Sequence, residues 1–144
     1  MIALVRPHAW DLPLFLHVLG ATALFGAVLT VATLSFGALR IPAHAALLRT
    51  LTFRTLLFLL WPAYVVMRVA AQWSLNKENL DTNSPSWVGV GFVVSDVGIV
   101  VLLLLTLLAW LSKRRPWAGQ LVAGLSSLYL VALGVAWFYM SAKP

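Results

Sequence analysis

The chain has no cysteine and very little charge. Only 10% of its 144 residues are Asp, Glu, Lys or Arg, whereas soluble domains contain about a quarter. The missing cysteine excludes disulfides, thiol redox chemistry and cysteine-ligated metal or iron–sulfur sites. The sequence also has no phosphate-binding glycine loop, no Ser-His-Asp order and no HxxH or HExxH spacing among its histidines. These absences exclude a soluble domain and favour a protein that is not an enzyme.

What the chain has instead is four long apolar runs. They cover residues 12–39, 55–73, 88–111 and 120–140, and each comes close to or exceeds the ~20 residues that cross a bilayer as a helix. Because backbone groups in lipid must be satisfied internally, we expect an all-α polytopic membrane protein. Its fold should be a four-transmembrane-helix bundle in which residues 1–144 form a single domain, with the lipid bilayer as its first partner. The first run is longer than the apolar part of a signal peptide, so we expect it to remain as a span.

The basic residues predict the orientation of the bundle. The two connections on one side, residues 40–54 and 112–119, carry basic residues and no acid: Arg40, Arg49, Arg54, Lys113, Arg114 and Arg115. Cytoplasmic connections are enriched in Lys and Arg, so both termini should lie outside (N-out/C-out) in a multi-pass protein of the bacterial inner membrane. This bias also explains the net charge of +6 without a nucleic-acid partner, because the charges lie at span ends.

Asp96 lies in the third run with no basic residue beside it. A carboxylate in hydrocarbon must be paired with a cation, protonated or in contact with water. At ~1.5 Å per residue from the span ends, His17, Arg68 and Asp96 reach a similar level in the outer half of the bilayer. Tyr64 and Ser95 lie at or just below it, and the inner half contains no comparable set. We predict an internal Arg68–Asp96 ion pair that fixes helix register, with His17 hydrogen-bonded nearby. The alternative is a polar cavity, open to the outside, that binds a ligand or passes protons.

A haem or metal site is the third interpretation of these residues. His17 is the candidate iron ligand within the spans. His44 cannot join it, because His44 lies on the opposite side of the membrane. Two-histidine ligation within one chain is therefore disfavoured. His17 with Met140 or His8, or the His17 side chains of two subunits, remain as ligand pairs. Haem b is the cofactor that the sequence leaves open.

Small residues at three- and four-residue spacing predict faces for close helix packing. One stripe lies in the first run and another in the third: Gly26, Thr30, Thr33 and Gly37, then Gly91 and Gly98. Pro62 lies near the centre of the second run and should kink it, because proline has no N–H and clashes with the preceding turn. That run also has the most polar face of the four, with Trp61, Tyr64, Arg68 and Gln72.

The segments HVLGATALFG (17–26) and RTLLFLLWPAYVVMR (54–68) resemble small bacterial four-span membrane proteins. These include the copper-resistance D family, the HemJ-type protoporphyrinogen oxidases and uncharacterised relatives, to which the second segment is most similar. The resemblance to the HemJ-type proteins implies that His17 is associated with haem. Those proteins commonly have a Pro-Arg pair after the first span, where this chain has Gly37-Ala38-Leu39-Arg40. They are also expected to have a basic residue where this chain has Asp96, and both departures disfavour oxidase activity.

Two hypotheses for function follow. The leading one is a non-enzymatic accessory or scaffold subunit of a larger membrane assembly, bound to other membrane subunits or to itself, because the short connections leave little else for recognition. The alternative is a haem-, ligand- or proton-handling membrane protein that uses His17, Arg68 and Asp96. A channel or transporter is disfavoured, because four short helices enclose little volume and the sequence shows no inverted repeat.

Overall fold

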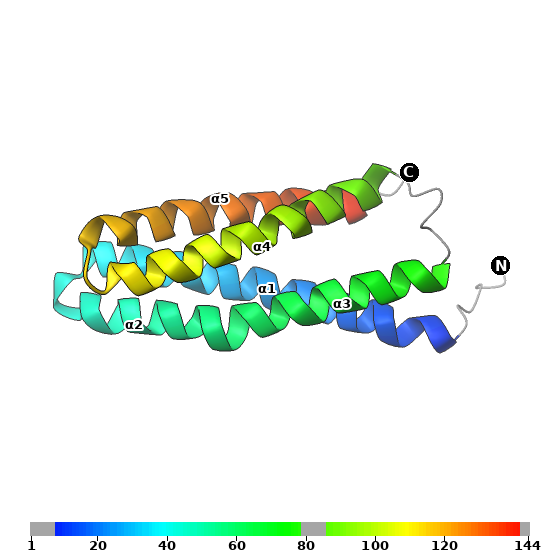
Figure 1. The fold of residues 1–144 in the computed structure, drawn as a ribbon, viewed down its shortest axis with the longest axis horizontal. Coiled ribbons are helices and arrows are strands. Elements are labelled where there is room, and N and C mark those ends of the chain that lie inside the picture. The colour runs from blue at the N-terminus through cyan, green and yellow to red at the C-terminus, as the bar shows by residue number, and fades with distance from the viewer. Residues whose placement is uncertain (1–7, 79–85, 142–144) are drawn as a thin grey trace.

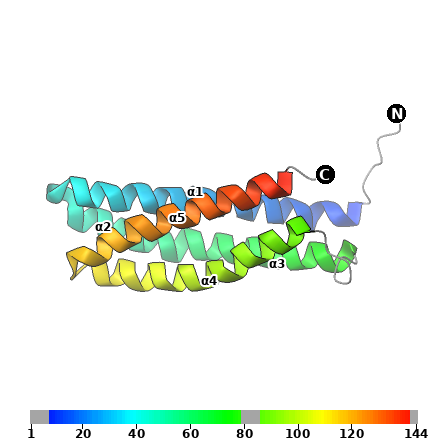
Figure 2. The same ribbon diagram turned by 90° about the horizontal axis from the view of Figure 1, so that it is seen from above.

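The computed structural model describes residues 8–78 and 86–141, and the side chains of residues 8–11, 78, 86 and 87 lie outside the description. Every element in these two ranges is helical, and four helical rods are long and apolar enough to cross a membrane, so the predicted all-α four-helix bundle is confirmed. Neighbouring rods run antiparallel (Figures 1 and 2). We call the end where α1 begins and α5 stops the terminal end, and the opposite end the loop end.

The first rod is α1, His8–Arg40, and the short 3-10 helix η1, Pro42–His44, follows it. The second rod is continuous and consists of α2 (Ala45–Thr55), the π-helical turn η2 (Leu56–Leu60) and α3 (Trp61–Glu78). The last two rods are α4 (Ser86–Ser112) and α5 (Pro116–Ser141). α1 packs against α3 and α5, and α5 packs against α4, whereas α4 meets the second rod mainly through α2 and η2. α3 and α4 therefore have little direct backbone packing at the terminal end.

The first connection is shorter than the sequence predicts. The predicted connection covers residues 40–54, but α2 already begins at Ala45, so only residues 41–44 lie between the two rods. Arg49 and Arg54 consequently lie on a helix and not in a loop. A basic residue near the end of a span does not end the helix, because its long stem lets the charged head reach the interface while the backbone stays helical.

The disturbance expected at Pro62 takes the form of a π turn. η2 ends directly before Trp61, whose N–H donates to the carbonyl of Leu56, five residues earlier. In a regular α-helix the carbonyl of Phe58 would receive no hydrogen from Pro62 and would clash with its ring. The wider turn relieves this clash, so the rod continues through the proline.

The core of the bundle consists of aliphatic side chains from all four rods. Its large, fully buried members are Leu24, Val28 and Val31 of α1, Leu56 and Leu60 of η2, Leu102 and Leu105 of α4, and Val122 of α5. Many large apolar side chains on the outside of every rod are exposed. A continuous apolar exterior of this kind suits contact with lipid.

The small-residue stripe predicted on the first span lies mostly on the exposed side of α1. Among the described residues, no atom outside its own stretch of helix lies within 4 Å of a Cβ added at Gly26, and Thr30 and Thr33 are exposed, with hydroxyls that donate to the backbone of their own helix. Gly37 meets another helix, through Leu48 of α2. The packing of α1 on α3 and α5 leaves Gly26, Thr30 and Thr33 on the exposed side of α1.

The stripe on the third span packs against α5, and the structure contains a further tight contact that the sequence does not predict. A Cβ at Gly91 would collide with a methionine of α5, and a Cβ at Gly98 would collide with Tyr129. The missed contact joins α1 to α3, where a Cβ at Gly20 would lie 2.6 Å from the backbone nitrogen of Met67 and 2.8 Å from its Cα. Because backbone atoms line this contact, no side-chain movement can make room there.

Candidate ligand-binding site

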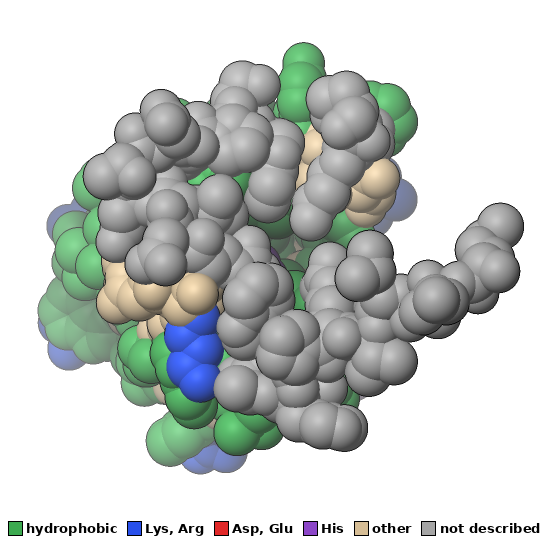
Figure 3. Space-filling view, turned by 90° about the vertical axis from the view of Figure 1, so that its right-hand side faces the viewer, with side chains coloured by type: hydrophobic (Ala, Val, Ile, Leu, Met, Phe, Trp, Pro, Cys, Tyr) green, Lys and Arg blue, Asp and Glu red, His purple; other side chains and the backbone are tan. Residues whose placement is uncertain are grey.

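A cavity of about 380 Å³ lies between α1, α3, α4 and α5 in the terminal half of the bundle. Figure 3 views the bundle from this terminal end, where described hydrophobic side chains are visible around the rim of the face. Most of the lining is apolar, and its large members include Leu24, Phe25, Leu133, Trp137 and Met140. The polar side chains in the lining are His17, Arg68, Ser74, Ser95, Tyr129 and Ser141. A mostly apolar cavity with a few polar groups is the usual form of a small-molecule site.

His17 contributes an imidazole to this lining from α1. Its Nδ1 lies 3.1 Å from the backbone carbonyl of Met67 on α3, a contact that the close approach at Gly20 makes possible. A carbonyl oxygen can only accept, so in the neutral ring Nδ1 carries the hydrogen and Nε2 keeps its lone pair. His17 therefore contributes either a hydrogen-bond acceptor or a metal ligand.

Two buried hydroxyl groups of the lining have no hydrogen-bond partner among the described residues. They are Oγ of Ser95 on α4 and the phenol of Tyr129 on α5. Tyr129 is only 3% exposed, and its hydroxyl lies against Gly98. Tyr64 differs, because its hydroxyl donates to the backbone carbonyl of Ser95 at 2.8 Å. A buried hydroxyl without a partner costs ~1–3 kcal/mol. Neither oxygen is exposed at the cavity surface, so a polar group bound in the cavity would reach them only after their side chains turn.

Arg68 and Asp96 form an ion pair, as predicted, but the pair is not internal. Nη2 of Arg68 lies 3.3 Å from Oδ1 of Asp96, Nη1 donates to Gln72, and the guanidinium lies over the ring of Phe92. The Asp96 side chain is 63% exposed and that of Arg68 30%. Arg68 lines the cavity, whereas Asp96 is not among the described residues that do. The expectation of an internal pair is therefore wrong, because α3 and α4 separate here and Arg68 crosses the gap between them to its outer side.

The exposure of Asp96 has an energetic consequence in a membrane. A carboxylate at the centre of a span costs about 2.5–3.5 kcal/mol on insertion scales. The short Asp96 side chain cannot reach the interface, whereas the long stem of Arg68 can bring its charge to Asp96. The ion pair offsets part of the cost but leaves a polar group facing outward from the bundle.

The cavity lining contains side chains of the types that ligate haem iron. Met140 lines the same cavity as His17, so the lining contains the imidazole and the thioether that serve together as axial ligands in cytochromes c. His44 lies in η1 at the loop end, and the side chain of His8 lies outside the described residues. Within the described ranges no group of three or more His, Asp or Glu residues could hold a metal ion. This donor set allows a haem without distinguishing it from an organic ligand.

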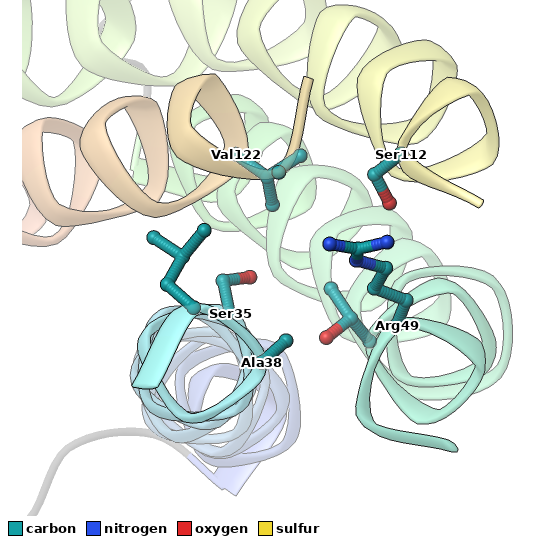
Figure 4. A pocket seen from close by; sticks show the side chains of 8 residues that line it. Ser35, Ala38, Arg49, Ser112 and Val122 are labelled. Carbon is teal, nitrogen blue, oxygen red and sulfur yellow. The ribbon is translucent and has the colours of Figure 1, made fainter. Parts of the chain in front are cut away.

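A second polar cavity lies at the loop end, where the sequence predicts no comparable set. It measures only about 10 Å³ and is lined by α1, α2, α4 and α5 (Figure 4). Nε of Arg49 and Oγ of Ser35 are buried there without a partner in the described part of the chain, and Ser112 lies beside the guanidinium. This volume suffices for about one water molecule. A single water could accept from Arg49 and donate to Ser35, so this cavity suits a structural water and not a ligand.

The structure thus divides the five residues that the sequence groups together. His17, Ser95 and Arg68 line the cavity, Tyr64 lies behind it on the Ser95 backbone, and Asp96 lies outside. Sequence reasoning missed Tyr129, which contributes one of the two free hydroxyls. Its position in the middle of a span was the available signal, because tyrosines of membrane proteins gather at the interfaces.

Comparison of the chain with protein-family models, curated protein sequences and solved structures found no match in any of the three.

Proposed function

We propose that this protein is a membrane-embedded binding protein for a small amphipathic molecule, held in the terminal-end cavity. The observation that carries the proposal is the mostly apolar cavity of about 380 Å³, which His17 and Arg68 line and which the unpartnered hydroxyls of Ser95 and Tyr129 lie behind. His17 and Arg68 contribute their polar groups from α1 and α3. A ligand with an apolar body and a polar head would satisfy both parts of this lining.

Each polar side chain has a separate role in this proposal. His17 accepts from the polar head or, in the case of haem b, would ligate the iron. The hydroxyls of Ser95 and Tyr129 lie behind the cavity surface and turn toward the head when the ligand binds. Arg68 lies at the edge of the cavity, where its charge can attract an acidic substituent such as a carboxylate or a haem propionate. The loss of one neutral hydrogen bond costs ~0.5–1.5 kcal/mol, so Tyr129→Phe should weaken binding about 2- to 12-fold.

We further propose that the terminal end faces the outside of a bacterial inner membrane. The support is the charge of the loop end, where the basic residues of the first and third connections gather. The positive-inside bias assigns such an end to the cytoplasm. The cavity then opens from the outer half of the bilayer.

The first test is to purify the protein in mild detergent after haem-replete expression and to look for a retained ligand. We expect native mass spectrometry to detect an additional bound mass, and oxidised and reduced absorption spectra to show whether it is haem. Ala136→Phe fills the cavity from α5 and should release the ligand, whereas Val131→Phe, on the exposed side of the same helix, should retain it. A purified protein with no bound mass and no absorption band would contradict the proposal.

A second function, that of an accessory or scaffold subunit, has separate support. Asp96 exposes a carboxylate on the outside of α4 at membrane depth, and a neighbouring subunit would satisfy it better than lipid does. Asp96→Asn should release such a subunit while a ligand in the cavity stays bound, because Asp96 does not line the cavity. Recovery of the same complex with the variant would contradict this second role.

A further inference from the structure

We propose that the Arg68–Asp96 pair is one half of a symmetric contact, and that a second copy of this chain docks on it. The docking face consists of the outer sides of α3 and α4 in the terminal half of the bundle. This inference rests on the accessory-subunit proposal, which it deepens by naming the partner. It does not depend on whether the cavity holds a ligand.

The ion pair has unused hydrogen-bonding capacity on its outer side. Among the described residues, Asp96 accepts through Oδ1 alone, and Arg68 gives one N–H each to Asp96 and Gln72. A carboxylate has acceptor sites on both oxygens and a guanidinium has five N–H donors. The 63% exposure of the Asp96 side chain leaves this capacity open to a neighbouring molecule.

Lipid cannot use this capacity at the depth where Asp96 lies. Asp96 is ten residues along α4 from Ser86, which corresponds to ~15 Å of helix. That depth is below the headgroup region of a bilayer whose full thickness is ~40–45 Å. The partner must therefore be another protein segment that brings both a donor for Asp96 and an acceptor for Arg68.

A second copy of the chain satisfies this requirement by symmetry. Arg68 on α3 and Asp96 on α4 lie at one level, so the vector from the positive to the negative charge lies largely in the membrane plane. Two copies with the same orientation in a membrane are related by a two-fold axis along the membrane normal, which reverses every in-plane vector. Arg68 of each copy then faces Asp96 of the other, and the four charges alternate in sign. A contact with a single unrelated helix would need that helix to bring both charges.

The apolar surface around the pair suits a helix contact. The exposed side chains flanking it are valines on both helices: Val65 and Val69 on α3, and Val93 and Val97 on α4. Valine has few rotamers, so little conformational entropy is lost when a neighbouring subunit packs against it.

Disulfide crosslinking tests the contact directly, because the chain has no cysteine of its own. Val93→Cys should form a dimer on mild oxidation in native membranes. Val131→Cys on α5 is the matched control, since the two valines are 63% and 64% exposed. The control should remain monomeric, because α5 lies away from the proposed axis.

Charge exchange separates a contact between copies from a pair within one copy. Arg68→Glu and Asp96→Lys should each lower the dimer fraction in nanodiscs at least about ten-fold. When the two variants are mixed, every intermolecular contact again joins opposite charges, and heterodimers should form. The neutral double variant Arg68→Met/Asp96→Leu should fold as a monomer, which tests the contact even if a single variant fails to fold.

The outcomes are distinguishable. A Val93→Cys homodimer with restored pairing in the mixture supports the inference. The two-fold contact is overturned, while the accessory role stands, if the wild-type chain is monomeric in nanodiscs and the Val93→Cys variant crosslinks only to a different protein. If Val93→Cys forms no crosslink of either kind, both are overturned.

Discussion

Gly20→Ala is the substitution for which the structure makes the sharpest stability prediction. The added Cβ would lie 2.6 Å from the backbone nitrogen of Met67, whereas ordinary contact begins at 3.4 Å. α1 and α3 must therefore separate by about 0.8 Å, the difference between these distances. The bond between His17 and the Met67 carbonyl lies about one turn away, so it would lengthen from 3.1 Å past the usual limit of ~3.2 Å for N–H···O bonds.

The expected cost combines three terms. Overpacking costs ~1–3 kcal/mol, and the weakened hydrogen bond of His17 adds ~0.5–1.5 kcal/mol. The replacement of a helical glycine by alanine returns ~1 kcal/mol. We therefore expect Gly20→Ala to lower the free energy of unfolding by roughly 0.5–3.5 kcal/mol.

Gly26→Ala is the matched control, two turns further along the same helix. In the described part of the chain, no atom outside its own stretch of helix lies within 4 Å of the added Cβ, so the substitution should be neutral or stabilise the protein by up to ~1 kcal/mol. Both variants can be unfolded reversibly by SDS in mixed micelles and followed by tryptophan fluorescence. If Gly20→Ala proves as stable as Gly26→Ala, the close approach of α1 and α3 is wrong.

Two further predictions concern the buried polar groups. Tyr64→Phe should destabilise the protein by ~1 kcal/mol because it removes a 2.8 Å hydrogen bond. Tyr129→Phe should leave the stability unchanged or raise it, since the Tyr129 hydroxyl has no partner in the described chain. Equal losses of stability for the two variants in the same unfolding assay would refute this prediction. Nε1 of Trp61 donates to Thr106 at 3.0 Å, so a double-mutant cycle of Trp61→Phe and Thr106→Val should give a coupling energy of ~0.5–1.5 kcal/mol. A coupling energy near zero would show that this bond does not contribute.

The four spans and the level of the polar residues could be predicted because both depend on position along one helix. Hydropathy and span length place the rods, and the rise per residue places Tyr64 level with Ser95 and Arg68 level with Asp96. The structure joins both pairs by hydrogen bonds. The predicted end of the first connection was wrong. Basic residues near this boundary, such as Arg49, are typical of loops but are also compatible with a helix.

The direction in which a side chain points could not be predicted with the same success. It depends on how each rod is turned about its own axis, and that follows from all helix pairings together. The outward direction of Asp96 and the backbone contact of Gly20 both come from this rotation. The same rotation decides that the Tyr129 hydroxyl faces Gly98. Without this pairing, the sequence could not show that the hydroxyl has no hydrogen-bond partner in the described chain.

The π turn of the second rod has a consequence for how this chain can vary. Leu56–Leu60 holds one residue more than an α-helical turn would need, and one residue corresponds to about 100° of rotation. Deletion of a single residue here would turn Tyr64 and Arg68 away from α4 while Arg49 kept its place at the loop end. The inserted residue thus allows the two halves of this continuous helix to point different faces toward their neighbours. The residues of this helix at the loop end and those at the cavity can then mutate without having to share one helical register.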